Sequence, residues 1–293
     1  MIARKVRFRA LDFVVLILCI ALGIYVYYRI QYGLQYKGNW GVIPGFLIKL
    51  DSTTGRWVPN FLLEGLITTL KLSVWATLLA ILFGVIAGLF RTGSNLFMRM
   101  VGRTYVELIR NLPPLVLIYI FYFFVVDQLM RMSGIQLFAQ NMSDSVAGVV
   151  GVFFAERTLL TQFISGVITV AFFEGAYITE IIRAGIESIE RGQNEAAYSL
   201  GLSWADKMRF VIMPQAIKRV LPPLANEFIN TVKYSSITSV VSIQELTYMG
   251  RTAVVETRYM FETWITVAAM YLVLTLTLSF FAGYLEKRLR QSD

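Results

Sequence analysis

The sequence predicts an all-α membrane protein with about six transmembrane helices. Of its 293 residues, 56% are hydrophobic and only 16% are charged, which leaves too few polar side chains to cover a soluble domain. The hydrophobic residues gather in runs such as 72–90, which carries no charge and is long enough to cross a bilayer. The lysines and arginines that give the net charge of +8 lie mostly between these runs, as the positive-inside rule expects.

Composition excludes several kinds of chemistry. The chain has no histidine and a single cysteine, Cys19, so it lacks the commonest general base and cannot form an intrachain disulfide. No Gly-x-x-x-x-Gly-Lys-Ser/Thr sequence occurs, so a P-loop for ATP is absent. We therefore predict a protein that is not an enzyme, with no catalytic residue and no metal site. Its basic charge is explained by membrane topology rather than by a nucleic-acid partner.

The N-terminal segment, residues 1–30, is predicted to be a cytoplasmic tail and an extra transmembrane helix. A signal peptide would also begin with basic residues and a hydrophobic run, here 13–28. This run ends in tyrosines rather than in the small residues of a cleavage site, so we expect it to be retained. If this run were cleaved, five transmembrane helices would remain, and the predictions for the rest of the chain would be unchanged. Residues 31–60, with Trp40 and Trp57, predict an external loop at the membrane interface.

The main transmembrane domain is predicted over residues 61–290. Its first helix is expected to begin near Phe61, several turns before the uncharged run that forms the crossing itself. Gly84 and Gly88, one helical turn apart, predict a close contact with another helix of the same bundle.

The second crossing of this domain is predicted at 111–126. It is entered through Pro113 and Pro114, which free main-chain carbonyls that neighbouring protein or water must satisfy. The mixed composition of the following residues, 127–157, predicts an external insertion with some buried surface.

Three more crossings are predicted at 158–173, 221–243 and 264–285. The segment 221–243 contains the polar residues Asn226, Glu227, Asn230 and Lys233, and charges at membrane depth are costly. We therefore expect an interior helix that lines a pathway or a subunit contact. Six crossings place both termini on one side, and the segments on that side are the richer in lysine and arginine, which predicts cytoplasmic termini.

A polar stretch at 192–206, which we call the elbow, interrupts this hydrophobic chain. Residues 195–200 can form a short helix that Gly201 ends, because glycine tolerates the left-handed conformation beyond a last turn. Ser203, three residues before Asp206, resembles a capping box that opens a second helix. Small alanines at the start of the elbow would let another protein approach closely.

The spacing of the elbow resembles the cytoplasmic loop of bacterial ABC importer permeases. The matching residues are Glu195, Ala196, Ala197, Gly201, Val211, Met213 and Pro214. The family usually has Ile and Leu at the positions of Val211 and Met213, and we expect Pro214 to end or kink the second helix. In that family the loop, here about 186–217, holds a coupling helix that docks in a cleft of a separate ATPase subunit. The resemblance implies that docking involves Glu195, Ala196, Ala197, Ser199, Leu200, Gly201 and Leu202.

Further motifs resemble permeases of the polar amino-acid uptake family, of the histidine, glutamine and glutamate–aspartate type. They are Glu107-Leu-Ile-Arg110-Asn-Leu-Pro113, the helix 176–186, Gly192-Gln-Asn-Glu195-Ala196-Ala197 and Lys233-Tyr234-Ser235-Ser236. Tyr234 departs from the Asp- or Asn-led run that the family usually has there. The N-terminal helix and the insertion 127–157 look like additions to the family core.

The resemblance implies a type I importer core of five helices in the bacterial cytoplasmic (inner) membrane. Its partners would be an ATP-binding cassette ATPase, a second copy of the permease or a homologous one, and an external amino-acid-binding protein. ATP and Mg would be used by the ATPase, so this chain would bind no cofactor. The function implied is uptake of polar amino acids.

Candidate substrate contacts are the polar groups at plausible depth, namely Glu174, Tyr177, Glu180, Arg110 and Lys233. An amino acid needs an acceptor for its ammonium group and donors for its carboxylate. The simpler interpretation of Glu180 with Arg183, and of Glu107 with Arg110, is an ion pair within one helix. Glu174 has no basic residue at helical spacing, so it is the sharpest candidate.

An ion-coupled secondary amino-acid transporter is the alternative. Glu174, Glu227 and Lys233 would then be proton or ion sites. Such carriers often contain internal repeats with broken helices, and the sequence shows no such repeat. They also need no docking elbow, so we expect the importer. A membrane scaffold would leave the buried charges without a purpose.

Overall fold

The computed structural model of the chain describes residues 10–33, 38–53, 55–93 and 95–290. It divides into two units, Met1–Val42 and Ile43–Asp293. The predicted basic tail, residues 1–9, lies outside the described residues. The predicted all-α fold class is confirmed, since the described residues are almost all helical apart from one short β-hairpin.

The first unit contains the predicted N-terminal helix. Helix α1 spans Ala10–Tyr28 and is followed by a π-helical turn, Arg29–Gly33, and by a 3₁₀ turn, Trp40–Val42. No side chain of α1 is buried, and the helix is long and apolar enough to cross a membrane. A helix that is hydrophobic on every side suits a lipid surrounding.

The second unit contains every other element. The elements are α2 Ile43–Leu47, β1 Ile48–Leu50, β2 Trp57–Pro59, α3 Phe61–Thr92, α4 Leu96–Asn111, α5 Pro114–Ile120, a π-helix Phe121–Val126, α6 Asp127–Ser133, α7 Ile135–Asn141, α8 Asp144–Phe153, α9 Leu160–Glu187, α10 Arg191–Ser199, α11 Trp204–Lys207, a π-helix Met208–Ile212, α12 Met213–Tyr234, a 3₁₀ helix Ser235–Val241, α13 Leu246–Thr257 and α14 Met260–Arg290. The predicted loop 31–60 therefore contains a short helix and an antiparallel hairpin, in which Lys49 lies opposite Val58.

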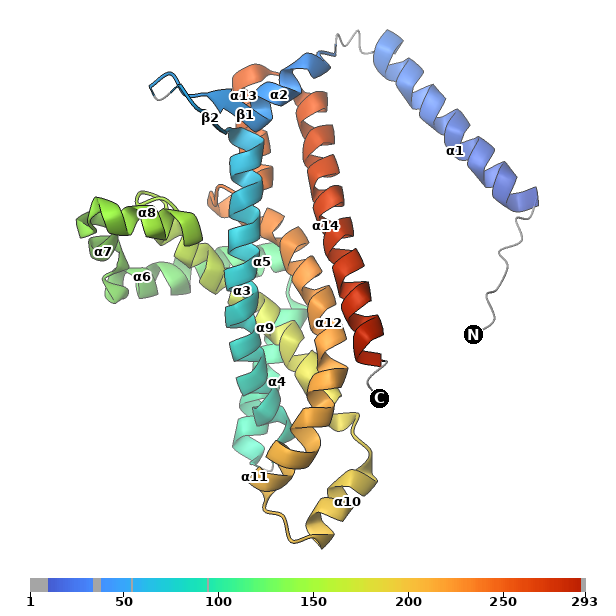
Figure 1. The fold of residues 1–293 in the computed structure, drawn as a ribbon, viewed down its shortest axis with the longest axis vertical. Coiled ribbons are helices and arrows are strands. Elements are labelled where there is room, and N and C mark those ends of the chain that lie inside the picture. Colours follow the sequence, from blue (N-terminus) through green and yellow to red (C-terminus); the bar gives the residue numbers. More distant parts are fainter. Residues whose placement is uncertain (1–9, 34–37, 54, 94, 291–293) are drawn as a thin grey trace. The chain divides into compact units, whose positions relative to one another are not determined.

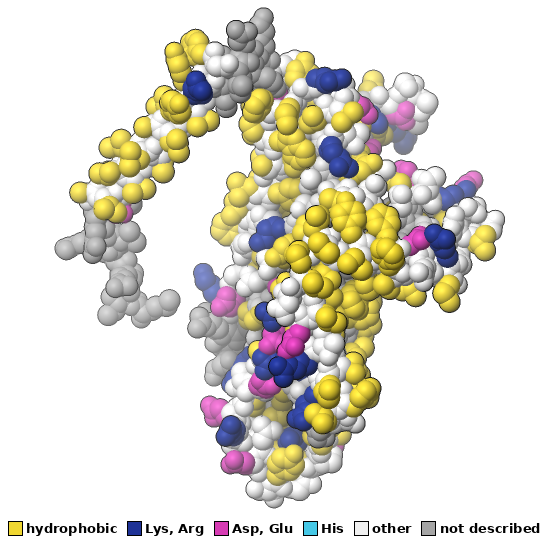
Figure 2. All heavy atoms as spheres, turned by 180° about the vertical axis from the view of Figure 1, so that it is seen from behind, with side chains coloured by type: hydrophobic (Ala, Val, Ile, Leu, Met, Phe, Trp, Pro, Cys, Tyr) yellow, Lys and Arg dark blue, Asp and Glu magenta, His cyan; other side chains and the backbone are white. Residues whose placement is uncertain are grey.

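Long helices form the body of this unit. Helix α3 runs along it beside α9, and α12 and α14 lie next to each other (Figure 1). The hairpin and α13 lie at one end, and α10 and α11 at the other (Figure 1). Figure 2 shows hydrophobic side chains over the middle of one face, with a group of charged side chains nearer the end that carries α10.

Five described helical segments are long and apolar enough to cross a membrane. They are Ala10–Tyr28, Phe61–Thr92, Pro114–Ser133, Leu160–Glu187 and Met260–Arg288. The sixth predicted crossing, 221–243, is helical as α12 and the 3₁₀ helix after it, but it is too polar to join them. This polarity is the property that predicted an interior helix there.

Helix α9 is the centre of the packing. Its residues Phe163 and Val167 join one hydrophobic cluster, and Ile178 and Ile182 join a second. The third cluster brings its Phe173 against α4. The predicted glycine contact is confirmed, because a Cβ at Gly84 of α3 would lie 2.4 Å from Cγ2 of Ile178.

The predicted crossing at 111–126 has the expected irregular entry but a different end. Helix α4 stops at Asn111 and α5 begins at Pro114, so the two prolines separate them. The helix continues beyond Val126, the predicted end of the crossing, because α6 extends it to Ser133, and the candidate membrane span is Pro114–Ser133. Asp127 does not end it, since its carboxylate accepts a 2.7 Å bond from Arg131 one turn later. Gly134, with φ of 72°, is the residue that leaves the helix.

Helix α12 also differs from its prediction. Pro214 does not end the helix, because the helical backbone runs from α11 through the π-helix Met208–Ile212 into α12. Pro214 lies within this continuous stretch and has no N–H to donate to the preceding turn. Pro222 and Pro223 lie inside α12, although the crossing was predicted to begin beside them. Each leaves a main-chain carbonyl of the preceding turn without its helical donor.

A buried hydrogen-bond network joins α13 to α14. Glu245, which is fully buried, accepts 2.8 Å and 2.6 Å bonds from the main-chain N–H of Tyr248 and the hydroxyl of Tyr271. Burial raises the pKa of the Glu245 carboxyl, and these two hydrogen bonds oppose the shift. Thr69 of α3 accepts from the main-chain N–H of Leu246 at 3.1 Å, so three helices meet at this point.

We expect Tyr271→Phe to destabilise this junction. The substitution leaves a buried carboxylate oxygen without its donor, which costs about 1–3 kcal/mol. The melting temperature of the purified chain in detergent should therefore fall. Tyr284→Phe, which removes the hydroxyl of a 66% exposed tyrosine of the same helix, should leave it unchanged. Equal melting temperatures for the two variants would show that the network contributes no stability.

Candidate functional site

The elbow has the helix–glycine–helix form that the sequence predicts. Helix α10 begins at Arg191, four residues earlier than expected, and ends at Ser199. Gly201 has φ of 71°, and the main-chain N–H groups of Gly201 and Leu202 donate to the carbonyls of Tyr198 and Ala197 at 2.9 Å and 3.1 Å. This pair of bonds is a Schellman motif.

The second half of the elbow begins at a side-chain cap. The hydroxyl of Ser203 accepts a 3.2 Å bond from the main-chain N–H of Asp206 and donates to the Asp206 carboxylate at 2.6 Å. Lys207 is buried, lies 4.3 Å above the ring of Tyr198 and donates to its hydroxyl at 3.0 Å. The two short helices are therefore held at a fixed angle by local contacts.

The elbow presents a mixed apolar surface. Of the predicted docking residues, Glu195, Ala196, Ser199, Leu200 and Gly201 are exposed, and Leu202 is half-buried. Ala197 is buried, so it packs the elbow together rather than facing outward. The side chain of Leu200 is 79% exposed, and Tyr198, Trp204 and Phe210 are exposed near it in sequence. These three aromatic residues were not among the predicted docking residues, although their position beside polar loop residues could have indicated them.

A pocket of about 520 Å³ gathers three of the five predicted substrate contacts. Arg110 of α4 and Tyr177 and Glu180 of α9 line it, together with Ser188, Arg219 and Glu227. We call it the inner pocket, because Ser188 lies at the end of α9 that leads into the elbow. Glu227 and Arg219, both on α12, were not among the predicted contacts.

Ion pairs occupy Glu180 in the inner pocket. The predicted pair of Glu180 and Arg183 is confirmed, and Arg183 also pairs with Glu187. Arg91, near the end of α3, reaches Glu180 as well. Sequence reasoning missed Arg91 because it lies 89 residues away and only tertiary packing brings it there.

Arg110 makes a different contact from the one predicted. The expected pair of Glu107 and Arg110 is wrong, because Glu107 instead accepts a 2.6 Å bond from Arg103 on the preceding turn. The guanidinium of Arg110 lies 5.5 Å from the ring centre of Tyr177, in a cation–π contact. Arg110 thus faces the pocket with its hydrogen-bond donors available to a ligand.

Glu174 lies one helical turn from Tyr177 and is fully buried. Neither oxygen of its carboxylate has a hydrogen-bond partner among the described residues. Thr231 lies close to Glu174, but its hydroxyl donates to the main-chain oxygen of Glu227 at 3.0 Å. The acidic group close to Glu174 is Glu227, a residue that is itself only 8% exposed.

Lys233 lies outside the inner pocket. Lys233 lies near the end of α12 and is exposed. Asn226, earlier in the same helix, is also exposed. The polar residues predicted to make α12 an interior helix therefore divide into two sets. Glu227 faces the bundle of this chain, whereas Asn226 and Lys233 face away from it.

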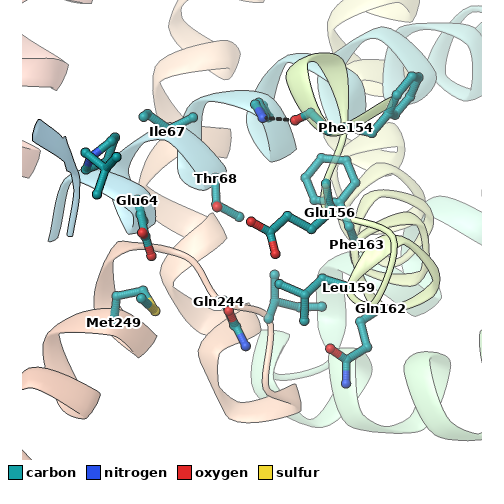
Figure 3. Close-up of a pocket in the computed structure, with 16 residues that line it drawn as sticks. Glu64, Ile67, Thr68, Phe154, Glu156, Leu159, Gln162, Phe163, Gln244 and Met249 are labelled. Atoms are coloured by element: carbon teal, nitrogen blue, oxygen red, sulfur yellow. Dashed lines mark hydrogen bonds between the residues drawn. The ribbon is translucent and has the colours of Figure 1, made fainter. Parts of the chain in front are cut away.

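A second pocket, of about 410 Å³, lies at the other end of α3 and contains no predicted site residue. Glu64, Thr68 and Glu156 point into it, and Thr68 and Glu156 approach each other across it (Figure 3). Lys71, which also lines it, donates to the carbonyl of Gly151 at 2.6 Å. Glu64 and Glu156 are exposed, so this is an open polar hollow rather than an enclosed cavity.

Comparisons with known proteins agree with the motifs. A family model described as "Binding-protein-dependent transport system inner membrane component" matches residues 80–291. The "Probable glutamine ABC transporter permease protein" of Bacillus subtilis is 36% identical over 78% of this chain and 94% of its own length. The glutamine transport system permease protein of Escherichia coli is 32% identical over 78% of this chain and 93% of its own length.

Solved structures of ABC transporters also resemble this chain. The crystal structure of an amino acid ABC transporter with histidines is 37% identical, with a TM-score of 0.62, over 78% of this chain and 94% of that chain. An inward-facing methionine ABC transporter has a TM-score of 0.59 over 78% of this chain and 96% of that chain, at 16% identity. This second likeness concerns the fold alone.

Proposed function

The chain belongs to the family of binding-protein-dependent transport system inner membrane components, and we propose that it is the permease subunit of an ATP-driven importer of a polar amino acid. It is accordingly a multi-pass transport protein of the inner membrane. The observation that carries the proposal is the elbow, a rigid and exposed projection with the spacing of a coupling helix, at one end of a bundle of membrane-crossing helices.

The proposed role of the elbow is to dock an ATP-binding cassette ATPase subunit. Leu200, with Tyr198 and Trp204, would supply the apolar contact, and Glu195, Ala196, Ser199, Gly201 and Leu202 would surround it. Ala197 would support the docking surface from inside. ATP and Mg would be bound and used by that partner, and both termini of this chain would lie on the same, cytoplasmic side.

The proposed complex also contains a second permease, as another copy of this chain or a homologous one. Lys233 and Asn226 support a contact along α12, because polar side chains at membrane depth are costly when they face lipid. A pathway between the two permeases would be closed on one side at a time, and closure of the ATPases would move the elbows to switch it. An external amino-acid-binding protein would deliver the substrate.

The inner pocket is the proposed substrate site of this subunit. Arg110 is placed to bind the carboxylate of an amino acid, and Glu227 its ammonium group. Tyr177 would position Arg110 through their cation–π contact. Glu180 is already paired with Arg91 and Arg183, so its proposed role is to hold α3 and α9 together beside the pocket.

Purification of the tagged chain in mild detergent, followed by mass spectrometry, tests the proposal. We expect an ATPase subunit to copurify, and vesicles that contain the complex to take up an amino acid only with ATP. A chain that purifies alone and transports in response to an ion gradient without ATP would support the ion-coupled alternative, which no relative in the comparisons favours.

A further inference from the structure

The insertion between α6 and α9 contains a helix that lies outside the core of the bundle. Helix α8, Asp144–Phe153, is apolar and has no buried side chain. An apolar helix of about 10–14 residues is too short to cross a bilayer, and it belongs in a protein core or at a membrane surface. Since α8 is not buried among the described residues, the membrane surface is the alternative that remains.

Helix α8 packs against the bundle with one side only. Its Ala147 and Val150 contact a cluster that includes Leu160, the first residue of α9. The large exposed side chains of α8 are Val146, Val149, Val152 and Phe153. Positions 146, 149 and 153 are spaced as neighbours on one face of a helix. Asp144 is the only charged residue from 132 to 155, so this exposed face is apolar and carries no charge.

Two hydrogen bonds set the depth of α8 along α3. Nζ of Lys71 donates to the carbonyl of Gly151 at 2.6 Å, and the indole N–H of Trp75 donates to the carbonyl of Phe153 at 2.9 Å. Lys71 directly precedes the uncharged run 72–90 that crosses the bilayer, and Trp75 lies one turn inside it. The end of α8 is therefore level with the edge of the hydrocarbon region. Figure 1 shows α8 at a level between the hairpin and the elbow.

The same two bonds supply donors that a helix end needs where water is scarce. The last carbonyls of a helix have no donor within it, and near lipid their partners must come from the protein. Lys71 and Trp75 meet this need at Gly151 and Phe153. In the turn before α8, Arg157 donates to the carbonyl of Met142 and lies 3.3 Å from the carboxylate of Asp144.

The geometry points to the lipid of the outer leaflet as the partner of the exposed face of α8. The helix lies along the membrane surface, with Val149, Val152 and Phe153 against the acyl chains and with Asp144 and Arg157 toward the head groups. The insertion joins two membrane-crossing segments, Pro114–Ser133 and Leu160–Glu187, so lipid adjoins it at both ends. This assignment concerns the insertion alone and does not depend on the substrate.

Fluorescence quenching in vesicles tests the inference. After Cys19→Ser, which leaves no other cysteine, Val149→Cys and Val152→Cys are each labelled with nitrobenzoxadiazole in the purified complex. The complex is placed in phosphatidylcholine vesicles, with a nitroxide near the head-group end of the acyl chains or with iodide in the water. We expect both labels to lose most of their fluorescence to the nitroxide lipid and little to iodide.

Two labelled sites serve as controls. Ser52→Cys, at an exposed position in the turn of the hairpin, should be quenched by iodide and not by the lipid. The native Cys19, exposed in the membrane-crossing helix α1, should be quenched by the lipid. Labels on α8 that behave like the one at residue 52 would place this face in water and overturn the inference. Labels that neither agent quenches would show that another protein covers the face, which would also overturn it.

Discussion

Gly201→Val is expected to lower ATP-driven uptake at least about tenfold while the chain still reaches the membrane in normal amounts. Gly201 has φ of 71°, and a left-handed conformation costs an ordinary residue about 1–2 kcal/mol, more for a β-branched one. Valine would relieve this strain by breaking the two bonds of the Schellman motif. The second helix of the elbow would then lose its fixed angle to the first, and so would the proposed docking surface.

Two further substitutions separate this effect from a general disturbance of the elbow. Gly201→Asn should retain most uptake, because asparagine tolerates the left-handed region. Gly192→Val places the same valine in α10, where the glycine has no positive φ and no atom lies near the new Cβ; uptake should change little. If Gly201→Val transported normally, or if Gly192→Val were equally impaired, the assignment of the elbow would fail.

Gly84→Leu is expected to prevent the chain from folding. A Cβ at Gly84 would lie 2.4 Å and 2.8 Å from Cγ2 and Cβ of Ile178, between the two helices that form the core of the bundle. Overpacking costs about 1–3 kcal/mol or more, and two helices packed along their lengths cannot separate locally. We therefore expect little monodisperse protein in detergent, as measured by size-exclusion chromatography.

A compensating substitution identifies the contact that is responsible. Gly84→Leu combined with Ile178→Ala should recover part of the folded protein, because the alanine makes space for the leucine. Gly148→Leu adds the same side chain in α8, where no atom lies within 4 Å of the new Cβ, and should fold normally. Recovery of normal yields by Gly84→Leu alone would contradict the close packing of α3 against α9.

Local signals account for what the sequence predicted correctly. The elbow could be predicted because its determinants, Gly201 and the Ser203 cap, act within a few residues. The pair of Glu180 and Arg183 was predictable for the same reason. The contact of Gly84 with another helix was also expected, but its partner Ile178 could not be named, because no local signal selects one neighbouring helix over another.

Tertiary contacts account for the points at which the structure differs from the predictions. Glu107 had basic residues at helical spacing on both sides, and the cation–π contact of Arg110 with Tyr177 decided in favour of Arg103. The helix of the second crossing runs beyond the predicted end at residue 126, and within this extension Asp127 accepts a bond from Arg131. Glu227 lines the inner pocket because the face of α12 that carries Glu227 lies toward α9. The spacing of residues in the sequence does not determine this rotation of the helix.

Site-specific cross-linking of the elbow tests the central claim most directly. The native cysteine is first removed by Cys19→Ser, which leaves no other cysteine in the chain, and Leu200→Cys then places one thiol at the 79% exposed tip of the elbow. Met132→Cys, at an 84% exposed position of α6, is the control. With a thiol-to-amine cross-linker on the purified complex, we predict that Leu200→Cys joins the chain to the copurified ATPase and that Met132→Cys does not. An elbow thiol that never reaches the ATPase, in a complex that still hydrolyses ATP and transports, would contradict the account.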